Sequence, residues 1–303
     1  MEKHIASPWR KYPANPILGG ELGTCFDLCV LPEDGRYRMW FSWRPRKSVA
    51  LVESVDGIHW SEPVICLGPN PDSGWEEEIN RVTVVRRDDG YQMWYTGQVF
   101  GASERSQIGY ATSPDGVHWE RRSVAPVLSP TEPWEKVAVM CPHVRWNAEL
   151  EQYQMWYSGG EQYEPDAIGY ATSTDGLHWV KLPTPVFQAD PTLRWENQKV
   201  TACQVIREDD GYYMFYIGFR DIHYAQIGLA RSRDGITNWE RHPGNPIIAP
   251  GPNPQAWDAD ATYKPFVVRD GKRWMLWYNG RRGDVEQIGL ATYEGDDLGF
   301  PKW

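Results

Sequence analysis

The sequence predicts an all-β fold, a five-bladed β-propeller of four-stranded antiparallel blades, and repeated patterns carry that prediction. An Asp-Gly turn followed closely by a tryptophan recurs at intervals of roughly 60 residues. It occurs at 56–60, 115–119, 175–179 and 234–239. A proline followed by two apolar residues comes after each copy, at 63–65, 126–128, 185–187 and 246–248.

A fifth copy is divided between the two ends of the chain. The segment 9–17, which begins with Trp9 and ends with Asn-Pro-Ile, is similar to 239–247. The last repeat has no such segment of its own, so the N-terminal segment is predicted to complete it. Ring closure of this kind covers the strand edges that an open array would expose.

The remaining strands follow in order within each repeat. An aromatic-rich run of strand length stands at 37–41, 91–95, 153–157, 212–216 and 274–278. Asp-Gly turns, which favour hairpins, precede most of these runs. A third run follows at 49–52, 108–111, 168–171, 227–230 and 288–291. The sequence therefore predicts one domain over 1–303, with blades at about 20–68, 75–129, 134–188, 195–249 and 257–303 plus 8–18.

Composition narrows the classes of partner. The net charge is −10 and the pI is about 5.2, which disfavours nucleic acid because its binding needs clustered Lys and Arg. No apolar run is long enough to cross a membrane, so no membrane partner is expected. The first residues lack the apolar core of a signal peptide, and a cytoplasmic location is expected. The sequence does not indicate an oligomeric state.

The five cysteines show no paired Cys-x-x-Cys spacing. Four of them lie in or beside the first strand of a blade, where a small buried thiol fits the narrow space near the axis. Neither a metal site nor a cofactor is predicted.

Functional residues of a propeller are sought where the repeat breaks, because a ring of identical groups cannot carry out asymmetric chemistry. His59, His118 and His178 recur within the Asp-Gly turns and are interpreted as structural. A Trp-acid pair precedes most first strands, and a lock between blades is its predicted role. These pairs end in Glu76, Glu135, Glu196 and Asp258.

Polar residues that differ between blades remain at the starts of the first strands. They include Asp27, Glu78, Arg81, His143, Asp260 and Lys264. The loops between the second and third strands, which ring the same mouth of the channel, add Glu161, Arg220 and Arg281. Asp27 lies among apolar strand residues and needs a partner, for which Arg81 and Lys264 are the candidates. A purely structural ring of salt bridges is the alternative interpretation.

Phrases such as Tyr-x-Met-Trp-Tyr-x-Gly, Ile-Gly-x-Ala-x-Ser-x-Asp-Gly and Trp-x5-Asn-Pro-Ile run through the whole chain. In these it resembles the five-bladed β-propeller glycosidases, the superfamily of glycoside hydrolase families 43, 32, 68, 117 and 130. The resemblance implies that Asp27 is the general base or nucleophile. It also matches His143 to an aspartate of the furanosidase branch, and it finds no carboxylate at 201–203, where that branch has its acid.

The identity of the general acid is therefore undecided, and Glu78, Asp260 and His143 are the candidates. Arg81, Lys264, Glu161, Arg220 and Arg281 are predicted to bind the sugar hydroxyls or a charged group. Trp43, Phe100 and Phe219 are candidates for stacking on a sugar ring. Clustered cations, with Lys199 and Arg145 among them, also fit a phosphate site.

The predicted function is hydrolysis of a small oligosaccharide or glycoside by carboxyl groups in the central channel, with inversion implied by the resemblance alone. Three alternatives remain: a phosphate-dependent phosphorylase of the same fold, a sugar-binding propeller without catalysis, and a protein-binding scaffold.

Overall fold

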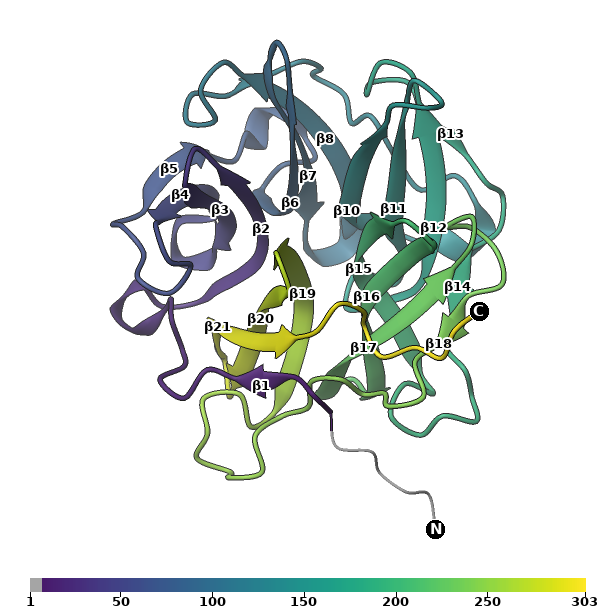
Figure 1. Ribbon diagram of the computed structural model, residues 1–303. Coiled ribbons are helices and arrows are strands. Elements are labelled where there is room, and N and C mark those ends of the chain that lie inside the picture. The colour runs from purple at the N-terminus through teal and green to yellow at the C-terminus, as the bar shows by residue number, and fades with distance from the viewer. Residues whose placement is uncertain (1–6) are drawn as a thin grey trace.

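The computed structural model describes residues 7–303, and these form an all-β protein of twisted, mainly antiparallel sheets. The sheets are arranged around a common centre (Figure 1). The helical segments are short 3-10 turns at Gly20–Leu22, Arg44–Arg46, Pro71–Ser73, Gly101–Ser103 and Pro133–Glu135. No helix within the described residues is long and apolar enough to span a membrane.

Two four-stranded sheets are formed by neighbouring strands in chain order. The first contains β2 (Cys25–Glu33), β3 (Arg36–Trp43), β4 (Ser48–Ser54) and β5 (Val64–Leu67). The second contains β15 (Lys199–Glu208), β16 (Gly211–Asp221), β17 (Tyr224–Ser232) and β18 (Glu240–Arg241).

A nine-stranded sheet contains two antiparallel groups joined by one parallel residue pair, Ala138 with Ser106. One group is β6 (Glu78–Arg87), β7 (Gly90–Val99), β8 (Arg105–Ser113) and β9 (Glu120–Arg121). The other is β10 (Ala138–Asn147), β11 (Gln152–Gly160), β12 (Pro165–Ser173), β13 (Val180–Lys181) and β14 (Phe187–Gln188).

The last sheet joins the two ends of the chain. It contains β19 (Ala261–Asp270), β20 (Arg273–Arg282), β21 (Val285–Glu294) and the N-terminal strand β1 (Arg10–Lys11). Arg10 pairs with Thr292 and Lys11 with Ala291. Figure 1 shows β1 beside β21, so the predicted partner of the N-terminal segment is confirmed.

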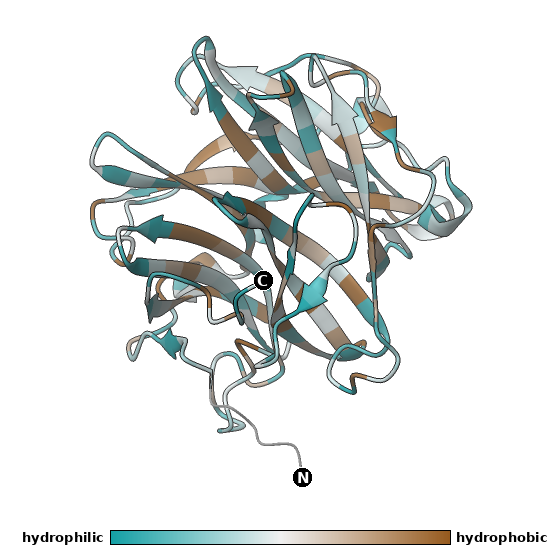
Figure 2. Ribbon diagram, turned by 45° about the vertical axis from the view of Figure 1, so that its right-hand side comes forward, coloured by the Kyte–Doolittle hydropathy of each residue, from teal (hydrophilic) through white to brown (hydrophobic). Residues whose placement is uncertain are grey.

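The strands at the centre contact one another in a closed order. β2 contacts β6, β6 contacts β10, β10 contacts β15, β15 contacts β19, and β19 contacts β2. Apolar residues lie mainly along the strands and polar residues in the connecting loops (Figure 2). The core is built from large rings, which the aromatic runs of the sequence supply. Trp40, Trp94, Trp156, Trp274 and Trp277 are fully buried.

A repeated hydrogen bond links one repeat to the next at four junctions. The indole N–H of a tryptophan in the second strand donates to the carbonyl of the glycine in the Asp-Gly turn of the following repeat. The pairs are Trp40 with Gly116 (2.9 Å), Trp94 with Gly176 (2.9 Å), Trp156 with Gly235 (2.8 Å) and Trp277 with Gly57 (2.9 Å). At Gly57 a Cβ would lie 2.8 Å from the ring of Trp277, and φ is +74°, so this position requires glycine.

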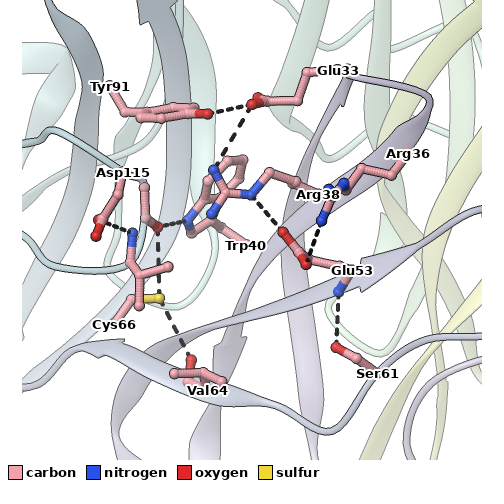
Figure 3. A network of polar contacts seen from close by, with 12 residues as sticks. Glu33, Arg36, Arg38, Trp40, Glu53, Ser61, Val64, Cys66, Tyr91 and Asp115 are labelled. Atoms are coloured by element: carbon pink, nitrogen blue, oxygen red, sulfur yellow. Dashed lines mark hydrogen bonds and ion pairs between the residues drawn. The ribbon is translucent and has the colours of Figure 1, made fainter.

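A charged cluster strengthens one of these junctions (Figure 3). The guanidinium of Arg38 lies 5.1 Å from the ring centroids of both Trp40 and Tyr91, and its Nε is 3.1 Å from Glu53. Tyr91 donates to Glu33, which also lies 3.9 Å from Arg38. Arg38 is therefore held between β3 and β7 by cation–π contacts and two carboxylates.

The acids of the Trp-acid pairs make contacts within one sheet, so the predicted lock between blades is wrong. Glu76 accepts from Tyr95 at 2.6 Å and from Arg121 of β9 at 2.8 Å. The other three acids make the same two contacts, one with a tyrosine hydroxyl and one with a cation. The sets are Glu135 with Tyr157 and Lys181, Glu196 with Tyr216 and Arg241, and Asp258 with Tyr278 and Lys11. The acid thus ties the entry to the first strand to the second and fourth strands of the same sheet. In the last sheet the cation is Lys11 of β1. In the other cases the cation comes from β9, β13 or β18.

The histidines of the Asp-Gly turns are structural, as predicted. His59, His118 and His178 each lie 2.7 Å from the aspartate of their own turn through Nδ1.

Trp9 anchors the N-terminal segment, and we expect Trp9→Ala to lower the free energy of unfolding by about 3–5 kcal/mol. Its ring is 8% exposed and packs against Phe215 and Tyr293, with centroids 6.0 and 5.6 Å away. Urea unfolding followed by fluorescence measures the loss. Trp303, which is 43% exposed, is the control, and Trp303→Ala is expected to cost about 1 kcal/mol or less. Equal losses would contradict the anchoring role.

Candidate active site

A β-bulge at the same place in each inner strand builds the centre of the molecule. The register of β2, β6, β10, β15 and β19 shifts at this point. The bulged residues all have positive φ, which is uncommon for residues other than glycine. They are Asp27 (48°), Arg81 (54°), Cys141 (53°), Ala202 (35°) and Lys264 (48°).

Side chains of the preceding sheet hold four of these bulges. The backbone N–H of Arg81 donates to Ser42 at 2.8 Å, and that of Ala202 donates to Ser158 at 2.8 Å. The N–H groups of Cys141 and Asp27 donate to Thr96 at 3.1 Å and Asn279 at 3.2 Å. These acceptors stabilise a strained backbone in the same way at each position, while the bulged side chain is free to differ.

A pocket of about 220 Å³ opens over these bulges. Asp27, Arg81, Cys141 and Ala202 line it, together with side chains from the loops that follow the second strands. The pocket holds four carboxyl groups and three guanidinium groups: Asp27, Glu104, Glu164 and Glu286 with Arg44, Arg81 and Arg281. Charged groups that converge on one concavity are the usual mark of a ligand or reaction site.

Asp27 is fixed by two neighbours. Its Oδ2 lies 3.0 Å from Nε of Arg81, and its Oδ1 accepts from Nδ2 of Asn279 at 2.9 Å. The side chain of Asp27 is 6% exposed, and that of Arg81 is 12% exposed. Of the two cations that the sequence offered as partners for Asp27, Arg81 makes the pair. The carboxylate is therefore held in one orientation at the base of the pocket.

Glu164 has a different environment in the same pocket. Burial raises the pKa of Glu164, and the negative charges of Asp27 and Glu286 raise it further against the opposing effect of Arg81 and Lys199. None of residues 7–303 forms an ion pair or a hydrogen bond with its carboxyl group. A carboxyl group with a raised pKa that faces open space can hold a proton and transfer it.

Glu286 is engaged by protein groups. Its carboxylate lies 3.2 Å from Arg44 and accepts from the hydroxyl of Tyr263. Burial and the charge of Glu286 raise the pKa of Tyr263 well above its usual value. Tyr263 therefore stays protonated and donates, which leaves Glu286 as a charged neighbour of Glu164 and Asp27.

The structure brings Asp27, Arg81, Arg281, Phe100 and Phe219 of the predicted residues to this pocket. Arg281 donates to the carbonyl of His223 at 2.6 Å, and its buried Nε has no partner within the described residues.

Other predicted residues lie outside the pocket lining and are occupied elsewhere. Glu78 pairs with Lys47 at 3.3 Å, Glu161 with Lys136 at 2.9 Å and Arg220 with Asp221 at 2.9 Å, while Asp260 is exposed and accepts from the N–H of Gly283 at 2.7 Å. Lys199 pairs with Asp166, Arg145 donates to Gln154, and Trp43 donates to Leu22. We therefore withdraw Glu78 and Asp260 as acids, and Glu161 and Arg220 as sugar ligands.

Lys264 occupies a bulge but is buried rather than part of the pocket lining. Burial raises the pKa of the Cys141 thiol to about 11, and the charges of Lys264 and Arg81 oppose that rise. The positive charge of Lys264 thus acts on Cys141 of the pocket lining from a buried position, and we withdraw Lys264 as a direct sugar ligand.

His143 is a link between sheets. Its Nε2 donates to the carbonyl of Val205 at 2.9 Å, and burial lowers its pKa to about 3. The same place in β2 holds Cys29, which contacts the backbone of Val84, and in β15 it holds Gln204, which bonds to both backbone groups of Val267. A buried neutral histidine outside the pocket does not serve as the general acid, so this candidate is also withdrawn.

Sequence reasoning missed Glu164 and Glu286. Glu164 belongs to the loop between β11 and β12, which the sequence placed at the mouth of the channel. Within that loop the sequence analysis selected Glu161, three residues earlier. Loops of different length cannot be aligned between repeats, so the repeat does not show which loop residue faces the pocket.

Comparisons with known proteins give a consistent result. The model of the glycosyl hydrolases family 32 N-terminal domain matches residues 29–198. An uncharacterised protein of Mycobacterium tuberculosis is 30% identical over 94% of this chain and 99% of its own. A probable sucrose-6-phosphate hydrolase of Psychromonas ingrahamii is 27% identical over 71% of this chain and 38% of its own. A crystal structure of a thermostable family-43 glycoside hydrolase superposes with a TM-score of 0.73 at 18% identity, covering 95% of this chain and 94% of the other.

The state of His143 predicts a stability that falls with acid. Its pKa is about 3 in the folded chain against an ordinary 6.5, so the unfolded chain binds more protons between these values. The free energy of unfolding should therefore lose about 2 kcal/mol from this group between pH 6.5 and pH 5.

Urea unfolding at several pH values checks this, with His143→Gln as the test variant. Glutamine can donate to Val205 as Gln204 does to Val267, and the variant should lose less stability on acidification than the wild type. His223→Gln, at an exposed position, is the control and should leave the pH dependence unchanged. The same pH dependence in His143→Gln and the wild type would show that His143 does not titrate in this way.

Proposed function

The chain belongs to the glycosyl hydrolase family 32 N-terminal domain family, and we propose that its central pocket hydrolyses a glycosidic bond with Asp27 and Glu164 as the two carboxyl groups. The resemblance to the propeller glycosidases is thereby confirmed, and the protein is a glycoside hydrolase. The observation that carries the choice of residues is the meeting of two unlike carboxyl groups in one pocket.

The two environments suit different steps. Glu164, whose raised pKa favours the acid form, donates a proton to the oxygen of the leaving group. Asp27, held by Arg81 and Asn279, either attacks the anomeric carbon or removes a proton from water that does so. After bond cleavage the proton lost by Glu164 lies on the released alcohol, and Glu164 is left as a carboxylate.

A small oligosaccharide or glycoside is the proposed substrate. A pocket of about 220 Å³ accommodates one sugar ring with its neighbour at the mouth, where Phe100 and Tyr163 are exposed. Relatives named for the hydrolysis of sucrose phosphate or β-fructofuranosides make sucrose and its phosphate worthwhile members of a substrate panel. The expected cytoplasmic location stays a prediction.

We also propose that the sheets form one five-bladed ring with the boundaries predicted from the sequence. The pairing of β1 with β21 supports closure, as do the cyclic contacts of the inner strands. The bond from Trp277 to Gly57 supports it further, because it joins the last repeat to the first.

Asp27→Asn is expected to reduce kcat/KM by roughly 10²- to 10⁴-fold on any glycoside that the wild type hydrolyses. Asparagine keeps the shape of the side chain and removes the base or nucleophile. The panel comprises aryl glycosides and short oligosaccharides, each with and without inorganic phosphate. Asp260→Asn is the matched control and should keep near-normal activity, because Asp260 is exposed and outside the pocket.

An active Asp27→Asn protein would overturn the proposal. A strict phosphate requirement would move the reaction to phosphorolysis. A sugar that raises the Tm without any turnover would favour a binding protein.

Glu164→Gln is expected to lose roughly 10²- to 10⁴-fold on glycosides with poor leaving groups and much less on dinitrophenyl glycosides. The difference arises because dinitrophenolate departs without protonation. In the wild type, kcat/KM should fall as pH rises through the pKa of Glu164, and this alkaline limb should vanish in the variant. A loss that is equal for all leaving groups would show that Glu164 does not donate the proton.

Inversion, which the family resemblance implies, predicts that the first anomer released is opposite to that of the substrate. Proton NMR during the first turnovers, before mutarotation, measures the outcome. Release of the same anomer would assign Asp27 as a covalent nucleophile instead.

A further inference from the structure

One side of the pocket is apolar. Ala202, Ile217, Phe219, Ala225 and Ala261 line it and pack together in one cluster, and each is at most 6% exposed. They come from β15, β16, β17 and β19. The rest of the lining is mostly polar and includes Asp27, Arg81, Gln98, Glu164, Arg281 and Glu286. The lining therefore combines one continuous apolar cluster, the apolar wall, with polar side chains, of which Arg281 lies beside the cluster, because its residue pairs with Ala261 and its guanidinium bonds to the carbonyl of His223.

The apolar wall arises from two breaks in the repeat. The place that follows the two aromatic residues of the second strand holds Ser42, Thr96, Ser158 or Asn279 in the other repeats, and each accepts a hydrogen bond from a bulged residue. In β16 that place holds Ile217, whose side chain cannot accept one. In β15 the bulged residue is Ala202, where β2 and β6 have Asp27 and Arg81.

These positions share the pocket with Asp27. Ala202 and Asp27 occupy the same place in their repeats, so they stand at the same depth along the axis of the molecule. A ring bound with its anomeric carbon close to Asp27 can thus present one of its edges to Ala202 and Ile217, which line the same pocket. A hydroxyl group on that edge would be removed from water without a partner, which disfavours binding.

We propose that the pocket selects a deoxy sugar, whose ring carries a methyl group in place of a hydroxymethyl group on the edge that faces Ala202 and Ile217. The inference rests on the proposed function and specifies its substrate class. A methyl group fills this wall and loses no hydrogen bond, while the hydroxyl groups on the opposite edge meet charged and amide side chains. Apolar sites of this kind discriminate against an added hydroxyl by roughly 100-fold.

Matched pairs of para-nitrophenyl glycosides that differ in a single hydroxyl test the proposal. The pairs are β-D-fucoside with β-D-galactoside, β-D-quinovoside with β-D-glucoside, and α-L-rhamnoside with α-L-mannoside. The leaving group is identical within each pair, so a preference reports on the sugar ring. In the pair with the better substrate, the deoxy member should have a kcat/KM higher by roughly 10- to 200-fold.

Two variants isolate the polarity of the wall. Valine and threonine have nearly the same shape, and both are smaller than the isoleucine that they replace. Ile217→Val should keep the preference for the deoxy member, while Ile217→Thr should reduce it by roughly 10-fold or more, because a hydroxyl partner becomes available. Thermal unfolding of both variants establishes that they are folded under the assay conditions.

The outcomes of these assays distinguish the deoxy-sugar inference from the glycosidase proposal. A wild type that hydrolyses the hydroxylated member of its best pair equally well, or faster, overturns the deoxy-sugar inference and leaves the glycosidase proposal standing. Equal preferences in Ile217→Val and Ile217→Thr would also overturn it. If no glycoside is hydrolysed, the proposed function fails, and the Tm shift produced by L-fucose against L-galactose tests the wall separately. A larger shift with L-fucose supports the inference, and equal shifts or none overturn it.

Discussion

The hydrogen bond from a buried indole N–H to the carbonyl of a turn glycine is the interaction on which the arrangement of sheets depends. Each such bond contributes about 1 kcal/mol net, but it also fixes a large ring against the next repeat. Glycine is required because the ring covers the space of a Cβ at a positive φ. The fourth repeat has Phe215 in place of tryptophan, and Trp9 from the N-terminal segment packs edge-on against it. The N-terminal segment therefore acts at the one junction that lacks an indole donor.

The bulges convert this repeated scaffold into an asymmetric site. Each inner strand keeps the same backbone kink, and three hydroxyl groups and one amide hold four of the five kinks. Because the backbone is secured by the neighbouring sheet, the bulged side chain has no structural duty. It can be an acid, a cation, a thiol or a methyl group without disturbing the sheets. One hydrogen-bond pattern thus stabilises the strained backbone of the bulge and also allows the side chain at that position to vary.

The strands, the partner of the N-terminal segment and the Asp27–Arg81 pair were predictable because the repeat supplies their register. The bulge was not visible in the sequence, and its effect explains the error at His143. The family resemblance matches His143 to an aspartate, whereas in the structure His143 follows the bulged Cys141 by two residues and bonds to the carbonyl of Val205 in the neighbouring strand. Glu164 was missed because it lies in a loop, where the repeat sets no register. The role of the Trp-acid pairs was misjudged since a recurring spacing does not say which sheet the acid contacts.

The different roles proposed for Asp27 and Glu164 follow from the groups that each side chain can contact. Asp27 belongs to a strand, so the neighbouring sheets reach it with a guanidinium and an amide that fix its orientation. Glu164 belongs to a loop above the bulges, where burial and two carboxylates act on it without a hydrogen-bond donor to offset them. The strand position thus suits Asp27 as a charged carboxylate, and the loop position suits Glu164 as the carboxyl group that carries the proton. The distance across the pocket is then set by the loop, which is free to vary while the ring of strands remains the same.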